Sequence, residues 1–157
     1  MRTIWLPLVA MLPLAGSPSS ALAAEAFETV QDLFAAIASY DYDGMRAAVT
    51  DDFQLLEAGE LWNIDTLVEQ ISEYEGKLTR RNYFSLIRSE EKGDLAWVSY
   101  WSMARYQTAD QQANRMWIES AVLERTESGW KIQMLHSTAI PRDKAPDGVN
   151  FTEYVKP

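Results

Sequence analysis

The sequence predicts an α+β fold in which helices come first and a long antiparallel sheet follows. Apolar residues recur at helical spacing in the first half of the chain, whereas a two-residue period dominates from Thr79 onward. Short polar breaks separate these later runs and are typical of hairpin turns. Because the helices precede the strands and do not alternate with them, the order favours an α+β fold over a βαβ fold.

The first 23 residues have the three regions of a secretory signal peptide. Arg2 supplies a positive charge, Ile4 to Ala15 is mostly apolar, and Ala21-Leu22-Ala23 fits the small-x-small cleavage pattern. The apolar run is shorter than the about 20 residues that a membrane-spanning helix needs. We therefore expect an exported protein, periplasmic or secreted, with no membrane span after cleavage. A buried N-terminal helix is the alternative interpretation.

In the mature chain we expect one domain over residues 24–142 and a loose C-terminal extension over residues 143–157. The composition of the chain excludes several kinds of site. The chain has no cysteine, one histidine and a net charge of −9. The lack of cysteine excludes disulfides and thiolate metal sites, and a single histidine is a poor basis for a transition-metal site. No glycine-rich phosphate loop and no dense basic patch is present, so we expect no metal, no cofactor and no nucleic-acid partner.

Local patterns place the individual elements. Asn63 is a typical helix cap, and Gly76 is placed to end the helix that follows it. The elements predicted before residue 79 are, in order, a helix over 25–39, a short helix up to Val49, a short hairpin over 53–62 and a third helix over 63–76. The strands predicted after it cover residues 79–90, 95–107, 115–127 and 130–140.

The strand over 95–107 is apolar on both of its faces. Trp97 and Trp101 share one face, whereas Val98 and Tyr100 share the other. A sheet with one wet side would alternate more cleanly. We expect the helices to cover one face and a second sheet or a partner subunit to cover the other. A homodimer through the sheet is the simplest symmetric arrangement.

Several short motifs resemble those of SnoaL-like domains in the nuclear transport factor 2-like superfamily. The motifs are Thr50-Asp51-Asp52-Phe53, Gly93 to Val98, Val122-Leu123-Glu124-Arg125, Gly129-Trp130-Lys131-Ile132, His136-Ser137 and Pro141. The first motif resembles the acidic-aromatic junction of that family, and the second resembles the turn into its first long central strand. The other four, taken together, resemble its last hairpin. The resemblance covers about residues 26–142.

The resemblance implies three N-terminal helices packed in a strongly curved, mainly antiparallel sheet: a cone with a pocket at its wide end. It also implies frequent dimers through sheet faces. It does not imply one activity, because the family includes ketosteroid isomerases, polyketide cyclases, dehydratases and non-catalytic binding domains.

His136 is the candidate catalytic residue. It follows Trp130, Ile132 and Met134 at two-residue steps, which predicts that all four side chains share one face. On the helix-covered face, His136 would lie at the pocket and could orient a ligand or act as a general base. A half-buried histidine with a structural hydrogen bond is the alternative.

The remaining candidates are one carboxylate and a set of aromatic residues. The residues expected around the pocket, with His136, are Trp62, Tyr40, Tyr83, Tyr100 and Asp52. The aromatic residues could instead be core, and Asp52 could bond backbone amides where helix becomes strand. Neither Glu119 nor Glu124 aligns with the catalytic aspartate of the steroid isomerases, which disfavours that chemistry.

These observations favour a non-catalytic or accessory domain that binds a small apolar or amphipathic molecule. The first rival is a cofactor-free isomerase, dehydratase or cyclase that uses His136 with a nearby carboxylate. The second is a protein-interaction module whose pocket is filled by its own aromatic side chains.

The signal peptide gives a direct prediction. Protein recovered from its native host should begin at Ala24, because the peptidase cuts after the small residue Ala23. N-terminal sequencing of the exported protein checks this. An intact Met1 on the exported product would contradict it.

Overall fold

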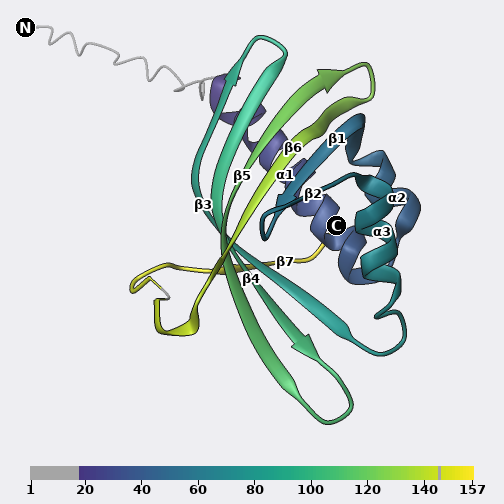
Figure 1. Cartoon of the computed structure of the whole chain (residues 1–157). Helices are drawn as coiled ribbons and strands as arrows, with labels where there is room; N and C mark the ends of the chain where they lie inside the picture. Colours follow the sequence, from purple (N-terminus) through teal and green to yellow (C-terminus); the bar gives the residue numbers. More distant parts are fainter. Residues whose placement is uncertain (1–17, 145) are drawn as a thin grey trace, which may run out of the picture.

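Three helices and a short hairpin precede the long strands, in the order that the sequence predicts (Figure 1). In the computed structural model, which describes residues 18–144 and 146–157, the helices are α1 (Pro18–Ser39), α2 (Tyr42–Ala47) and α3 (Ile64–Ser72). Helix α1 begins before the predicted start at Glu25, so it runs through the predicted cleavage site. The rest of the predicted signal segment lies outside the described residues. None of the described helices is long and apolar enough to span a membrane.

Side-chain caps fix where the shorter helices begin. The Asn63 side chain accepts a hydrogen bond from the backbone N–H of Thr66 at 2.9 Å, which confirms the predicted cap of α3. Asp41 caps α2 in the same way through the N–H of Gly44. A side chain at Gly44 would collide with Asp41, since a Cβ there would lie 2.3 Å from its Oδ2.

The sheet is curved, open and mostly antiparallel, which confirms the predicted fold class. Its strands are β1 (Val49–Glu57), β2 (Glu60–Trp62), β3 (Thr79–Lys92), β4 (Leu95–Gln107), β5 (Gln112–Thr126), β6 (Gly129–Ile140) and β7 (Thr152–Tyr154). The order across the sheet is β2-β1-β6-β5-β4-β3-β7. Strand β1 pairs with β6 in parallel, whereas the other pairs are antiparallel.

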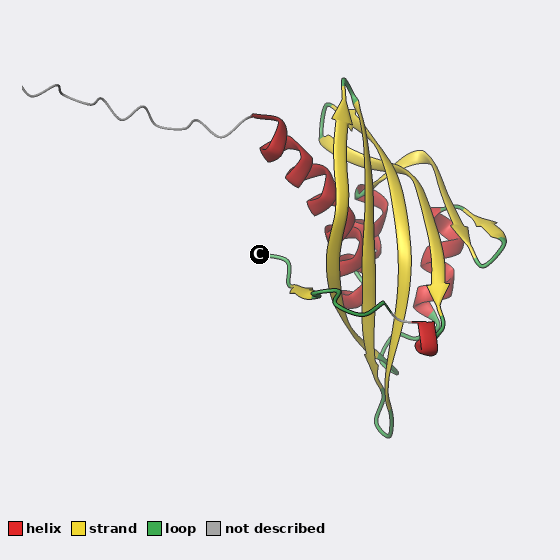
Figure 2. Ribbon diagram, turned by 90° about the vertical axis from the view of Figure 1, so that its left-hand side faces the viewer, coloured by secondary structure: helices red, strands yellow, loops and turns green. Residues whose placement is uncertain are grey.

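Helix α1 packs on the concave face of this sheet and forms the core with it (Figure 2). Every second residue of β4, from Ala96 to Ala104, is buried against the helices. Phe27 of α1 contacts the rings of Phe84 and Tyr100, with centroid distances of 6.0 and 5.5 Å. The face of β4 that carries Tyr100 is therefore the helix-covered one.

A β-bulge interrupts β6 and changes which of its residues face the helices. Val122 pairs with Met134, whereas the next residue of β5, Leu123, pairs with Ile132, so Gln133 has no partner on β5. The extra residue reverses the alternation. Before the bulge Ile132 is buried, and after it Leu135 and Ser137 are buried.

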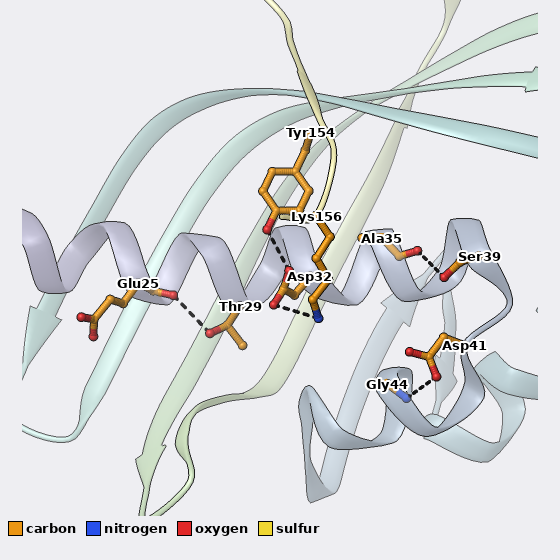
Figure 3. A network of polar contacts seen from close by, with 9 residues as sticks. All are labelled: Glu25, Thr29, Asp32, Ala35, Ser39, Asp41, Gly44, Tyr154 and Lys156. Atoms are coloured by element: carbon orange, nitrogen blue, oxygen red, sulfur yellow. Dashed lines mark hydrogen bonds and ion pairs between the residues drawn. The ribbon is translucent and has the colours of Figure 1, made fainter.

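The C-terminal segment is partly ordered on the sheet, so the expectation of a loose extension is wrong for its last residues. Strand β7 pairs with residues 82–84 of β3. The Tyr154 hydroxyl donates to Asp32 of α1 at 2.8 Å, and the Lys156 ammonium lies 3.3 Å from the same carboxylate (Figure 3). Because three strands separate β6 from β7, the connecting segment crosses the sheet, on the side away from the helices (Figure 2).

Candidate functional site

A cavity of about 450 Å³ lies where the C-terminal end of α1, helix α3 and the β4–β5 hairpin meet. Its lining residues come from four parts of the chain: Ile37, Tyr40, Ile71, Tyr74, Leu78, Arg80, Tyr106, Thr108, Gln111, Ala113 and Arg115. The walls combine aliphatic side chains, three tyrosines and two arginines. Such a mixture of apolar wall and few polar groups is typical of small-molecule sites.

Tyr40 joins the end of α1 to the segment between α3 and β3, on one wall of the cavity. It follows α1 with a φ of 57°, a left-handed conformation that ends the helix. Its hydroxyl donates to the Leu78 carbonyl at 2.6 Å and lies 2.9 Å from the Tyr74 carbonyl. Burial, with a smaller contribution from Glu75, raises the pKa of Tyr40. This hydroxyl is committed to backbone acceptors, so the ring is what Tyr40 offers to a ligand.

Arg80 is held in place on the cavity floor. Its Nε donates to the Asn82 side chain at 2.7 Å, and its guanidinium lies over the rings of Phe34 and Tyr106 at 5.2 and 5.5 Å. Asn82 is fixed in turn, because its amide donates to the backbone carbonyl of Phe34 at 2.7 Å. These contacts orient the cation without neutralising it.

A row of buried polar residues crosses the sheet behind this floor. Tyr100, Glu119 and Ser137 are register partners on β4, β5 and β6. The Ser137 hydroxyl donates to Glu119 Oε1 at 2.8 Å, and Glu119 is only 5% exposed. Burial raises the pKa of Glu119, while the Ser102 and Ser137 hydroxyls and Arg80 act in the opposite direction.

The second oxygen of this carboxyl is incompletely satisfied. Glu119 Oε2, Tyr100 Oη and Ser102 Oγ are all buried without a hydrogen bond of standard geometry. Both hydroxyls still interact with the carboxyl: burial and, after it, Glu119 raise the pKa of Tyr100 well above its ordinary value, and the Ser102 hydroxyl lowers the pKa of Glu119. The row thus combines a carboxyl favoured in its neutral form with an un-ionised tyrosine.

The buried row and the cavity are neighbours but do not coincide. On β5, Trp117 lies between Glu119 and the cavity residue Arg115 on the same face of the strand. Arg80 lines the cavity, and its charge also lowers the pKa values of Glu119 and Tyr100 in the row. Within residues 18–144 and 146–157, no three His, Cys, Asp or Glu side chains converge to hold a metal ion.

Two of the six predicted site residues belong to this region. Tyr40 lines the cavity, and Tyr100 is fully buried in the row behind it. Glu119 was not among the predicted residues, although its alternation with Ala121 and Leu123 places it on the core face. Arg80 and Arg115 were also missed, since an arginine in a strand normally indicates a solvated position.

The predicted placement of His136 is wrong. Because of the bulge at Gln133, His136 does not share the face of Ile132 but is exposed on the other side of the sheet. It lines a second pocket, of about 440 Å³, beside the β1–β2 turn, and Glu57 and Leu61 belong to the same lining. No contact connects it with the cavity.

The other three candidates also lie away from the cavity. Tyr83 is on the convex face of β3, with the Arg105 guanidinium 5.2 Å from its ring centre. Asp52 is exposed and accepts a hydrogen bond from the Thr50 hydroxyl at 2.8 Å, which lowers the pKa of Asp52. The Trp62 indole donates to Glu60 at 2.8 Å on the edge strand β2. The hydrogen bond of Asp52 is thus a local one to another side chain of β1.

Comparison with known proteins identifies the family. The family profile described as "SnoaL-like domain" matches residues 27–142. The chain belongs to the SnoaL-like domain family. No curated protein sequence matches it.

Solved structures with the fold of this SnoaL-like domain differ in their descriptions. A ketosteroid isomerase-like protein from Erwinia carotovora atroseptica has 16% identity and a TM-score of 0.62, over 75% of this chain and 95% of that chain. The CaMKII hub homology domain of Chlamydomonas reinhardtii has 21% identity and a TM-score of 0.67, over 76% and 98%. An NTF2-like protein from Cytophaga hutchinsonii has 18% identity and a TM-score of 0.58, over 73% and 94%. At these identities the likeness establishes the fold alone.

The buried carboxyl predicts a pH-dependent stability difference. Since burial favours the neutral form of Glu119, the native state holds this proton more tightly than the unfolded state does. Wild-type stability should therefore fall as pH rises from about 4.5, the ordinary pKa, through the raised native pKa. Glu119→Gln is always neutral, so its free energy of unfolding relative to wild type should improve across that interval.

Chemical denaturation at a series of pH values measures this difference. Glu124→Gln, an exposed change on the same strand, is the matched control and should give a smaller and flatter difference. Parallel stability curves for wild type and Glu119→Gln would show that the carboxyl is not held neutral.

Proposed function

We propose that this SnoaL-like domain is an exported protein that binds a small amphipathic molecule in the cavity between α1, α3 and the β4–β5 hairpin, without transforming it. The observation that carries the proposal is the lining of the cavity. Ile37, Ile71 and Leu78 offer an apolar wall, whereas the two arginines, Thr108 and Gln111 offer polar groups near the hairpin. Its volume of about 450 Å³ falls in the range of small-molecule sites.

The rival enzymatic function has less support from this geometry. His136 is on the opposite side of the sheet, and the residues that line the cavity include no carboxylate and no histidine. Glu119 would be the best acid or base, because it is buried beside Tyr100 with a raised pKa. A substrate in the cavity would have to pass Trp117 to reach it, so a binding role is favoured over proton transfer.

The interaction-module interpretation requires a cavity filled by the protein's own aromatic residues. Instead, the side chains of Tyr40, Tyr74 and Tyr106 line the cavity as walls around open space.

A cavity-filling substitution tests the proposed site. Native mass spectrometry of the wild-type protein should detect a co-purifying small molecule. Ala113→Trp should remove it, because an indole at this position occupies the space against Tyr106, its register partner. Gln112→Trp places the same group on the opposite face of β5 and should leave the ligand bound. Equal ligand retention by both variants would place the ligand elsewhere.

We also propose that two copies associate through the convex face of the sheet. Leu95 and Trp97 of β4 and Ile118 of β5 share this face and are 49%, 41% and 36% exposed. Large apolar side chains grouped on one face mark association surfaces, and a self-complementary contact gives a closed dimer.

Sedimentation tests this assembly. The mature protein should sediment at about twice its monomer mass at micromolar concentration, and Trp97→Glu should shift it to the monomer, because a charge would enter the apolar contact. Leu61→Glu, on the separate edge strand β2, should leave the dimer intact. A wild-type monomer under these conditions would rule out the dimer.

A further inference from the structure

We infer that the cavity selects an organic anion: a small molecule with an apolar body and one carboxylate or similar acidic head, the head lying against Arg115 and Arg80. This inference rests on the proposed function, because it assigns a charge to the ligand of the same cavity. Four observations lead to it.

The first observation is the sign of charge in the cavity. The chain carries a net charge of −9, yet the only charged side chains in the lining are the arginines Arg80 and Arg115. The cavity lining is therefore positively charged although the protein as a whole is negatively charged. Clefts lined by one sign of charge concentrate ligands of the opposite sign.

The second observation is that both cations lack an acidic partner. In the described part of the chain, neither Arg80 nor Arg115 forms an ion pair, whereas Arg46, Arg81, Arg88 and Arg125 each contact a carboxylate. An arginine offers five donors in a planar fork that matches a carboxylate. Its donors are therefore available on the cavity side.

The third observation is preorganisation. The Nε bond to Asn82 and the contacts with Phe34 and Tyr106 hold the Arg80 guanidinium without using an acid. A fixed cation loses less side-chain entropy when an anion binds. The buried acid on which the Arg80 charge acts is Glu119, and burial raises its pKa, which disfavours the negative charge that would compete with a ligand for Arg80.

The fourth observation is the separation of apolar and cationic parts. Ile37 and Ile71 come from the helices, whereas Arg115 and Gln111 come from the β4–β5 hairpin. A ligand would place its apolar body toward α1 and α3 and its acidic head toward the hairpin. The volume of about 450 Å³ is in the range of small-molecule sites, which favours a small carboxylate as the ligand.

Two fluorescent probes that differ by one charged group provide the test. Anilinonaphthalene sulfonate carries an anionic head, whereas N-phenylnaphthylamine has the same aromatic body without it. Binding of both probes to wild type is compared with binding to Ala113→Trp, so that only the fraction lost in this variant is assigned to the cavity. Arg115→Gln then removes one cation at an exposed position that does not support the core.

We expect Arg115→Gln to weaken cavity binding of the sulfonate probe by about tenfold, as for the loss of a charge-assisted hydrogen bond. The neutral probe should change by less than about twofold. Arg88→Gln, which removes the same charge from the convex face, should change neither. Circular dichroism confirms that each variant is folded.

The outcomes separate the two levels of the proposal. If Arg115→Gln weakens both probes equally, or neither, the charge preference is overturned while the cavity remains a binding site. If Ala113→Trp removes no binding of either probe, the cavity is not the site, and the proposed function and the charge preference both fail.

Discussion

The packing of α1 along the concave face of the sheet determines where the core ends and where the cavity begins. The helix contacts β3, β4 and β6 and buries Val30 and Leu33 completely. It ends at Ser39, where Tyr40 turns the chain in a left-handed conformation. Beyond this point the sheet continues toward the β4–β5 hairpin without α1 to cover it. A helix longer by two turns would fill the space that the cavity now occupies, since each turn adds about 5.4 Å.

The sequence predicted most of the elements because their signals are local. Helical and two-residue periods are visible in any short window, and the Asn63 cap is defined within four residues. The parallel pairing of β1 with β6 and the addition of β7 to β3 were not predicted, because both join residues distant in the sequence. A three-residue strand such as β7 has no periodicity from which to recognise it.

The bulge in β6 explains the largest error in the predicted site. A single extra residue at Gln133 leaves the residues on either side strand-like, so nothing in the local pattern marks it. Yet it exchanges the faces of every residue that follows, which moves His136 outward and Ser137 inward. The prediction for β4, which has no bulge against β5, was correct about which residues share a face, and Tyr100 lies on the side of the helices.

The face of the sheet on which a residue lies predicted membership of the site better than its residue type did. Tyr83 and Tyr100 are equally plausible from their chemistry, but only Tyr100 lies on the face that α1 covers. Glu119 was discounted because it matched no known catalytic position, although its alternation with buried neighbours already placed it inside. The side chains that give the cavity its charge, Arg80 and Arg115, belong to a residue type whose usual place is in solvent.

Arg80 links the cavity to the buried row because its charge acts on Glu119 and would also act on a ligand in the cavity. On the core side it is the cation that favours ionisation of Glu119, against the larger effect of burial. On the cavity side it carries no ion pair, so an anionic ligand would share this cation with the carboxyl. Two negative charges near one guanidinium raise each other's free energy, so a bound anion favours the neutral form of Glu119. By the same linkage, a neutral Glu119 strengthens binding of the anion. Burial, because it raises the pKa of this carboxyl, thus acts in the direction that favours binding of an anion at Arg80.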